Sequence, residues 1–177
     1  FPGVNLSLTH AFTETLTGTA YGGPRFVSST TQTVSDNIKV QNTIWLFGAS
    51  LAKKFESTSI QMNVDRDILP SGFGLLIQRD RAGLTVSHDL TETLAASLDG
   101  SGYLVSGVTP TALGGTIQES RYFYLTPKIA WKFLEWWKFE LSYTYRWRDV
   151  DGSSEPAMSN GTMFMLTYFP PKLALSN

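Results

Sequence analysis

The sequence predicts an all-β fold, an antiparallel meander of about nine strands. Two observations lead to this prediction. Apolar and polar residues alternate with a period of two along most of the 177-residue chain, and short connections alternate with long ones. Successive side chains of a strand point to opposite faces of a sheet, so this period gives each strand one apolar and one polar face. We find no stretch of ten residues with the periodicity of a helix.

The segment 137–149 shows the alternation most clearly. One parity carries Phe139, Leu141, Tyr143, Tyr145 and Trp147, and the other carries Lys138, Glu140, Ser142, Thr144, Arg146 and Arg148. The same split marks Val4–Phe12, Ile60–Val64, Leu84–Leu90 and Phe164–Tyr168. In chain order, the predicted strands are 3–12, 16–23, 43–53, 57–66, 74–90, 94–107, 119–133, 137–149 and 161–169.

The connections between these strands alternate in length. Four are very short and each contains one glutamate, at Glu14, Glu56, Glu92 and Glu135. The longer ones, 24–42, 109–118 and 150–160, are rich in turn-forming residues. The segment His10–Leu16 returns in similar form as His88–Leu94, and the glutamates recur about every 40 residues, which is the length of two strands, a tight turn and a loop. The tight turns therefore lie at one end of the sheet and the long loops at the other.

A meander with an aromatic apolar side fits either a membrane barrel or a soluble barrel or sandwich. Strands of about ten residues match a tilted bilayer crossing, and alternating short and long connections match periplasmic turns and outer loops. Aromatic residues gather beside the tight turns, where an interfacial girdle would lie, at Phe12, Phe55, Trp131, Phe133, Trp136 and Trp137. We therefore predict that residues 1–170 form part of a transmembrane outer-membrane β-barrel. The alternative is a soluble, lipocalin-like barrel that binds a ligand.

The membrane interpretation assigns directions and faces. With the tight turns in the periplasm, residues 171–177 form a periplasmic tail, and Phe139, Leu141, Tyr143, Tyr145 and Trp147 face lipid. Strand 3–12 then runs toward the periplasm, so a barrel with both termini inside lacks at least one strand. We expect the 3–12 edge to pair with missing N-terminal strands or with a partner chain. The start at Phe1-Pro2-Gly3, without Met or a signal peptide, predicts a processed product or an excised piece.

Composition excludes several other classes. Charged residues make up 16% of the chain, well below the roughly 25% of soluble domains, and 13% are aromatic, which excludes a disordered chain. The 14 Lys and Arg nearly cancel the 15 Asp and Glu, so no basic stripe predicts a nucleic-acid partner. The absence of cysteine excludes disulfides, thiolate metal sites and a cysteine nucleophile.

Several motifs resemble a known family. They are Leu69–Gly74, His88–Glu92, Tyr122–Trp131, Leu141–Arg146, Ser159-Asn160 and Tyr168–Lys172. Over residues 43–172 the chain resembles the C-terminal half of outer-membrane β-barrel proteins associated with exosortase/PEP-CTERM and exopolysaccharide systems of Gram-negative bacteria. The resemblance implies a bacterial outer-membrane location, a longer natural protein and a setting near envelope polysaccharide. It supplies no catalytic residues.

No pattern of residues predicts an enzyme. His10 and His88, the only histidines, occupy equivalent repeat positions two hairpins apart, so we interpret them as interfacial residues and not as metal ligands. The four turn glutamates are solvated residues spread around a rim, too far apart for acid–base work. No Gly-x-Ser-x-Gly motif is present. We therefore predict no catalytic residues, no metal and no cofactor.

The polar parity near the C-terminus carries the candidate functional residues. Lys128, Lys132, Lys138, Arg146 and Arg148 lie on adjacent strands, interrupted by Glu140. On a luminal face they would form a basic strip that favours anions, such as an anionic polysaccharide. The alternative is a static interior of paired charges. Farther back, residues 65–67 and 79–81 are charged triplets that we expect to pair above the membrane, where a lipopolysaccharide headgroup is the other candidate partner.

These patterns predict a porin-like or scaffolding barrel, linked by the resemblance to exopolysaccharide export. The second hypothesis is a structural barrel subunit of a larger envelope complex. The expected partners are outer-membrane lipid and lipopolysaccharide, together with polysaccharide or other envelope proteins.

Overall fold

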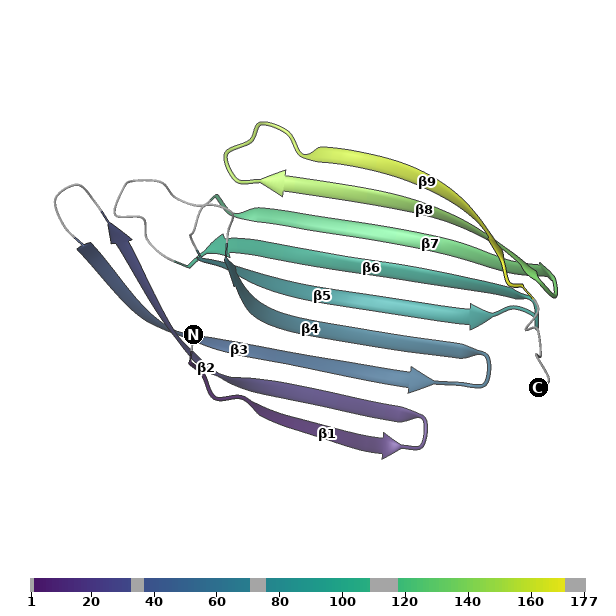
Figure 1. The fold of residues 1–177 in the computed structure, drawn as a ribbon, viewed down its shortest axis with the longest axis horizontal. Coiled ribbons are helices and arrows are strands. Elements are labelled where there is room, and N and C mark those ends of the chain that lie inside the picture. The colour runs from purple at the N-terminus through teal and green to yellow at the C-terminus, as the bar shows by residue number, and fades with distance from the viewer. Residues whose placement is uncertain (1, 33–36, 71–75, 109–117, 171–177) are drawn as a thin grey trace, which may run out of the picture.

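The computed structural model describes residues 2–32, 37–70, 76–108 and 118–170, and these contain nine β-strands (Figure 1). The strands are β1 (Leu6–Thr13), β2 (Leu16–Gln32), β3 (Asn37–Lys54), β4 (Thr58–Pro70), β5 (Leu76–Asp89), β6 (Leu94–Gly107), β7 (Ser120–Leu134), β8 (Trp137–Val150) and β9 (Ala157–Tyr168). Each strand pairs antiparallel with the next one along the chain, so the sheet order is β1 to β9. The predicted all-β meander is confirmed. The predicted tail, 171–177, lies outside the described residues.

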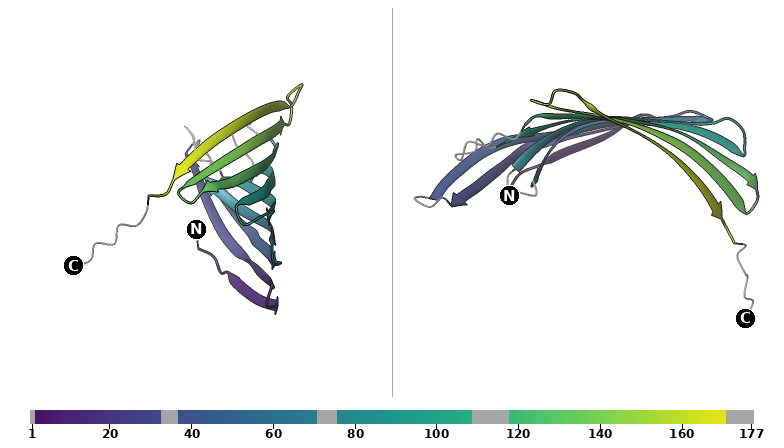
Figure 2. Two further views of the ribbon diagram at one scale, coloured as in Figure 1. Left: turned by 90° about the vertical axis from the view of Figure 1, so that its right-hand side faces the viewer. Right: turned by 90° about the horizontal axis from the view of Figure 1, so that it is seen from above.

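The nine strands form a single curved sheet that does not close on itself (Figure 2). β1 and β9 are its edges, and within the described ranges neither pairs with a further strand. The predicted partner of the β1 edge stays a prediction. The same ranges contain no helix long and apolar enough to span a membrane.

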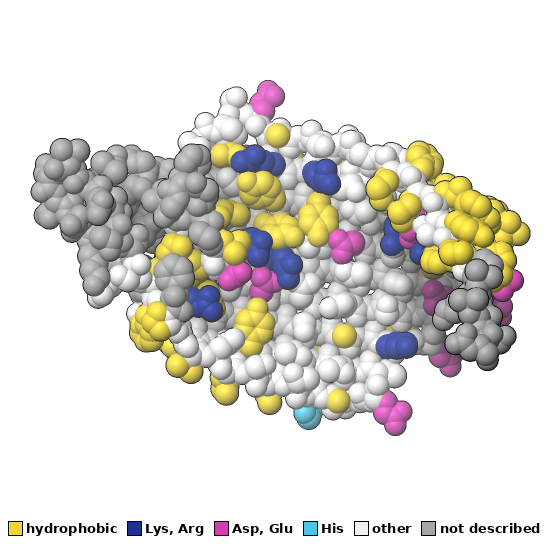
Figure 3. Space-filling view, viewed as in Figure 1, with side chains coloured by type: hydrophobic (Ala, Val, Ile, Leu, Met, Phe, Trp, Pro, Cys, Tyr) yellow, Lys and Arg dark blue, Asp and Glu magenta, His cyan; other side chains and the backbone are white. Residues whose placement is uncertain are grey.

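The two faces of the curved sheet differ in polarity. The buried polar residues, Ser101, Ser120, Glu140 and Ser142, share the parity that points to the concave face. Figure 3 shows this face, with charged side chains spread over its centre. Large apolar side chains occupy the convex face and stay exposed, as at Phe164, which is 69% exposed. A soluble barrel has the reverse arrangement, with apolar residues inside, so this polarity contradicts the lipocalin-like alternative.

The connections lie at two distinct ends of the sheet. The end with the tight turns after β1, β3, β5 and β7 is the turn rim, at the right in Figure 1, and the opposite end is the loop rim. The repeated Thr-Glu-Thr segment forms equivalent turns at the turn rim. Thr15 N donates to Thr13 Oγ1 at 3.3 Å, and Thr93 N donates to Thr91 Oγ1 at the same distance.

The predicted loop over residues 24–42 is wrong, because β2 continues to Gln32 and β3 begins at Asn37. Pro24 lies inside the ladder, opposite Trp45. Ser and Thr dominate residues 28–33, and threonine suits an extended backbone without an apolar partner face. In the proposed membrane location these parts of β2 and β3 lie beyond the lipid, where neither face of a strand has to be apolar. The two-residue period therefore disappears there while the strand continues.

Three other strand ends differ from their predicted positions. Gly3 makes only an isolated bridge to Arg25, and regular pairing of β1 begins at Leu6. β4 extends to Pro70, which pairs with Leu76, and β9 begins at Ala157, which pairs with Arg148. In each case the strand ends where its backbone stops pairing with the neighbouring strand. The two-residue period within one strand does not reveal where that pairing stops.

A close approach on the concave face requires a glycine. Gly48 on β3 lies opposite Tyr21 on β2, and a Cβ at Gly48 would overlap the tyrosine ring. By contrast, nothing lies within 4 Å of a Cβ built at Gly161 on β9. The ring of Tyr21 therefore covers the backbone at Gly48, and a larger residue at this position fits only if the ring moves.

We predict that Gly48→Ala lowers the free energy of unfolding by roughly 1–3 kcal/mol, because the added methyl group overpacks the site under Tyr21. Urea unfolding of the protein in lipid vesicles measures the change, and Gly161→Ala is the matched control. Adding Tyr21→Ala to the Gly48→Ala variant should remove most of the penalty. Equal losses for Gly48→Ala and Gly161→Ala would contradict the contact.

Candidate functional site

A row of charged and aromatic side chains crosses the concave face. Asp65 on β4 lies opposite Arg81 on β5, and the row continues through Tyr103 and Tyr122 to Arg148 on β8. Directly paired residues have Cβ atoms about 5 Å apart, so the five side chains form a continuous belt. It lies in the half of the sheet nearer the loop rim, where Figure 3 shows charged and aromatic groups together.

The β4–β5 part of this face is a set of ion pairs. Arg81 Nε lies 2.7 Å from Asp65 Oδ1, and Arg79 Nη2 lies 3.7 Å from Asp67 Oδ2. The predicted pairing of residues 65–67 with 79–81 is confirmed. The third pair, between Arg66 and Asp80, lies on the convex face, with two hydrogen bonds of 2.6 and 2.8 Å. The two concave carboxylates of β4 are therefore already bound by arginines of β5.

A second charged group lies nearer the turn rim and is centred on Glu140. Its Oε1 lies 3.0 Å from Lys138 Nζ and 3.6 Å from Lys128 Nζ. Glu140 is only 8% exposed, so its charge depends on these two lysines for compensation. The carboxylate in turn offsets part of the positive charge of Lys128 and Lys138.

Three tyrosines and three arginines form a third group, which we call the tyrosine–arginine cluster. Its members are Tyr103, Tyr122, Tyr124, Arg79, Arg146 and Arg148, and together with apolar residues of β5 to β9 they line a hollow of about 590 Å³. The rings of Tyr103 and Tyr124 stack with centroids 6.1 Å apart and planes at 26°. Arg148 Cζ lies 5.0 Å from the centre of the Tyr122 ring, and Arg79 Cζ lies 6.0 Å from that of Tyr103.

The five residues of the predicted basic strip lie in three places. Lys128 and Lys138 share Glu140, whereas Arg146 and Arg148 belong to the tyrosine–arginine cluster. Lys132 lies beside the turn rim, where the β7–β8 register shifts. Uncharged Thr126 and Thr144, whose hydroxyls are 3.1 Å apart, lie between the lysine group and the cluster.

Arg146 and Arg148 differ from Arg79, Arg81, Lys128 and Lys138, which form ion pairs on the concave face. Both are exposed, and among the described residues no carboxylate forms an ion pair with either of them. The sequence pattern points to these two arginines but not to the tyrosines beside them. The parity of Tyr122 and Tyr124, which is that of Lys128, was the available signal.

The predicted lipid-facing residues of β8 all lie on the convex face. Their partners across β7 and β9 are apolar in most cases; Leu141, for example, lies between Ile129 and Phe164. Tyr143 is 43% exposed, and its hydroxyl donates to Asn160 Oδ1 at 2.9 Å. Together with β7 and β9 these residues make a continuous apolar surface. Contact with lipid stays a prediction for Phe139, Leu141, Tyr143, Tyr145 and Trp147.

The histidines and the turn glutamates do not come together. His10 on β1 packs edge-on against Phe12, with ring centroids 4.8 Å apart. His88 lies four strands away on β5, where its Nδ1 is 2.8 Å from Thr58 Oγ1 of the neighbouring strand. Glu14, Glu56, Glu92 and Glu135 lie at four separate turns of the turn rim. Within the described residues no group of three or more possible metal ligands occurs.

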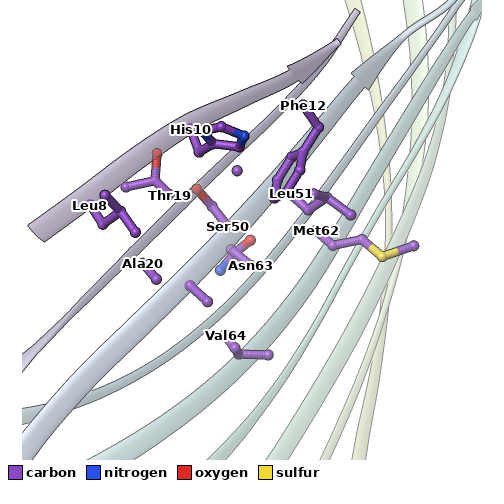
Figure 4. A pocket seen from close by; sticks show the side chains of 12 residues that line it. Leu8, His10, Phe12, Thr19, Ala20, Ser50, Leu51, Met62, Asn63 and Val64 are labelled. Carbon is purple, nitrogen blue, oxygen red and sulfur yellow. The ribbon is translucent and has the colours of Figure 1, made fainter.

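A second hollow, of about 350 Å³, lies between β1 and β4 beside His10 (Figure 4). It forms where the small convex residues Gly18, Ala20 and Ala49 lie between larger apolar ones such as Leu8 and Met62. Its lining is almost wholly apolar, as is that of the hollow beside the tyrosine–arginine cluster.

Known proteins resemble this chain in structure but not in sequence. No protein-family model and no curated protein sequence matches it. OmpT, an outer membrane protein of Vibrio cholerae, is similar in its in-vitro folded form, with a TM-score of 0.58, 12% identity and coverage of 94% of this chain and 55% of that one. Its trimer form gives a TM-score of 0.57, 13% identity and coverage of 94% and 56%.

At this identity the likeness shows the fold alone, and the chain spans about half the length of these proteins. The fold is that of an outer-membrane β-barrel wall. Because the similar structures are bacterial outer-membrane proteins, they support the predicted location. The narrower resemblance to exosortase-associated barrels stays a prediction.

We predict that Tyr143→Arg costs on the order of 2–4 kcal/mol of folding free energy in vesicles, because the charge enters the apolar face near the bilayer midplane. Thr144→Arg, at the next residue on the concave face, should cost much less. Urea titration of both variants in the same lipid measures the difference. A larger loss for Thr144→Arg would reverse the assignment of the two faces.

Glu140→Gln should destabilise the fold by about 1–2 kcal/mol, because it leaves Lys128 and Lys138 facing each other without a carboxylate. Glu119→Gln is the control, since its 3.3 Å pair with Arg121 is exposed to solvent and should contribute little. The same unfolding titration compares them. Indistinguishable losses would show that the Glu140 group adds no stability.

Proposed function

We propose that this chain forms part of the wall of an outer-membrane β-barrel, and that its concave face lines a water-filled, porin-like passage that favours anions. The observation that carries the proposal is the polarity of the sheet. Charged and hydroxyl side chains occupy the concave face, and large apolar ones are exposed on the convex face. Lipid outside and water inside would satisfy both faces at once.

The preference for anions rests on Arg146 and Arg148. The carboxylates of β4 are bound by arginines, and Glu140 is bound by two lysines, whereas these two exposed guanidinium groups form no ion pair among the described residues and contribute uncompensated positive charge. Confined positive groups favour anions in a pore. The family resemblance suggests envelope exopolysaccharide as the cargo, and this link is part of the proposal.

A complete passage requires more wall than the nine described strands. The similar OmpT chains are about twice as long as the matched region, and one of their forms is a trimer. We propose that further strands, or another chain at the β1 edge, complete the barrel. This would satisfy the backbone groups of both edges, which cost several kcal/mol each if they are left unpaired in lipid.

A static scaffold within a larger envelope complex is the second candidate. The observation that favours it is the pairing on the concave face, where Glu140 holds two lysines and β4 and β5 form ion pairs. A sealed interior of paired charges needs no transported solute. We propose no enzymatic role for either candidate.

The ion selectivity of the complete protein in planar bilayers tests the two candidates. Reversal potentials in a salt gradient should show anion preference, and Arg146→Gln with Arg148→Gln should reduce it. Lys128→Gln should reduce the anion preference less, because Glu140 already offsets that charge. Lys132→Gln measures how much the exposed cation at the turn rim adds to the same preference. Arg121→Gln on the convex face is the control and should change nothing.

A barrel without conductance would favour the scaffold. A conducting barrel whose selectivity does not respond to the two arginine substitutions would keep the passage but remove the assigned cause of its selectivity.

A further inference from the structure

The hollow of about 350 Å³ between β1 and β4 is a depression in the apolar convex face, and we call it the convex hollow (Figure 4). Its floor consists of small residues of β2 and β3, and Lys53, on the same face of β3, lies between it and the turn rim. We propose that the convex hollow binds one acyl chain of a glycerophospholipid whose phosphate lies at Lys53 and Thr15. This inference rests on the proposed function in requiring lipid against the convex face.

Side chains of different size give the convex hollow its shape. The floor is Gly18, Ala20 and Ala49, and the walls are large exposed side chains of β1 and β4, such as Leu8 and Met62. The backbones of β1 and β4 lie three strand spacings apart, about 14 Å. The wall side chains narrow this gap, so it admits a hydrocarbon chain but not a helix, which with its side chains measures about 10–12 Å across.

The β1 wall is restrained by contacts within the protein. The rings of His10 and Phe12 pack edge-on, with centroids 4.8 Å apart. A Cβ at Gly18 would lie 2.8 Å from Phe12 Cε2, so the ring of Phe12 leans over the floor of the hollow. Groups that are already restrained lose less conformational entropy when a ligand binds. The convex hollow is therefore a preformed site.

The almost wholly apolar lining selects a hydrocarbon as the occupant. A buried water molecule needs about two to four polar partners, which this lining does not offer. An empty hollow in a lipid-facing surface would lose the dispersion contacts of its lining. A flexible acyl chain restores those contacts with methylene groups along its whole length.

The position of the convex hollow assigns it to one leaflet of the bilayer. Its row farthest from the turn rim contains Ala20, Ala49 and Val64. Ala49 lies four residues from Lys53 along β3, about 13 Å at a rise of about 3.3 Å per residue. Half of the hydrocarbon core measures about 15 Å. The hollow therefore lies in the leaflet beside the tight turns, which in the predicted orientation is the periplasmic, phospholipid leaflet.

Lys53 supplies the contact for the phosphate. Its Nζ donates a hydrogen bond to Thr15 Oγ1 at 3.0 Å and lies 5.4 Å from the centre of the Phe55 ring. Among the described residues no carboxylate forms an ion pair with it. An ammonium group has three donors, so further donors remain for the oxygens of a phosphate. The headgroup contact and the chain site thus lie on one face of β3, at the separation that a single lipid spans.

Native mass spectrometry of the complete protein, released from detergent micelles after incubation with lipid, tests the proposal. The probes are dioleoyl phosphatidylglycerol and dioleoylglycerol, which has the same acyl chains and no phosphate. One phosphatidylglycerol per chain should bind at least about tenfold more tightly than further copies. Dioleoylglycerol should occupy the same site about threefold more weakly, because it lacks the contact with Lys53.

Filling the hollow tests the site of the acyl chain. Ala49→Phe should weaken binding of the first phosphatidylglycerol at least about tenfold, because the added ring occupies the floor. Ala82→Phe on β5 is the matched control, since Ala82 lies in the same row of the convex face but outside the hollow. It should leave the affinity unchanged. Ala20→Phe repeats the test from β2 if Ala49→Phe does not fold, as judged by resistance to SDS at room temperature.

Removing the charge tests the site of the phosphate. Lys53→Gln should weaken binding of phosphatidylglycerol about threefold and leave that of dioleoylglycerol unchanged. Lys54→Gln is the matched control, because the side chain of the next residue points to the concave face. It should alter neither affinity. Equal losses for both lipids in Lys53→Gln would overturn the placement of the phosphate.

Equal losses for Ala49→Phe and Ala82→Phe would overturn the proposal, because lipid would then cover the convex face without a preferred place. So would mass spectra in which a second copy of the protein replaces the lipid. The measurement needs no current and is independent of the proposed passage. A conducting barrel that retains no lipid would overturn this inference alone, whereas a barrel that retains lipid without conducting would support it and contradict only the passage.

Discussion

Pairing of the backbone in hydrocarbon is the constraint on which the rest of this structure depends. A peptide N–H or C=O in the bilayer has no water to bind, and leaving it unpaired costs several kcal/mol. The continuous antiparallel ladder from β1 to β9 satisfies both sides of every inner strand. It also requires long strands and places all described connections at the two rims. The two edges, β1 and β9, are the parts of the ladder that still need partners.

Once the ladder exists, the two-residue period divides the side chains between two solvents. Apolar side chains on the convex face need no packing partners from the protein, which explains why only Val27, Ile68 and Leu76 are buried hydrophobic residues among those described. In the proposed membrane location, lipid would take the place of the usual interior of a folded domain. Stability then depends on the ladder, on contacts such as Tyr21 over Gly48, and on charge pairing across the concave face.

The concave face is electrostatically uneven along its length. Near the turn rim, Glu140 offsets the lysines beside it, and β4 and β5 offset each other nearer the loop rim. Arg146 and Arg148 form no ion pair among the described residues, and their neighbours on β7 are tyrosines. Cation–aromatic contacts hold a guanidinium group without neutralising it. The tyrosine–arginine cluster therefore combines restrained geometry with unbalanced charge.

The sequence by itself determined the meander, the face to which each strand residue points, and the four tight turns. Each of these is a local property: a period of two along 137–149, or the repeated Thr-Glu-Thr at residues 13–15 and 91–93. Only the tertiary structure decided which residues lie opposite each other. The register joined Lys128 and Lys138 to one carboxylate and brought Arg79, Tyr103, Tyr122 and Arg148 from four strands to one hollow. It also extended β2 and β3 through residues without a period. Register is a relation between strands, set by hydrogen bonds across the sheet, so the pattern within a single strand does not contain it.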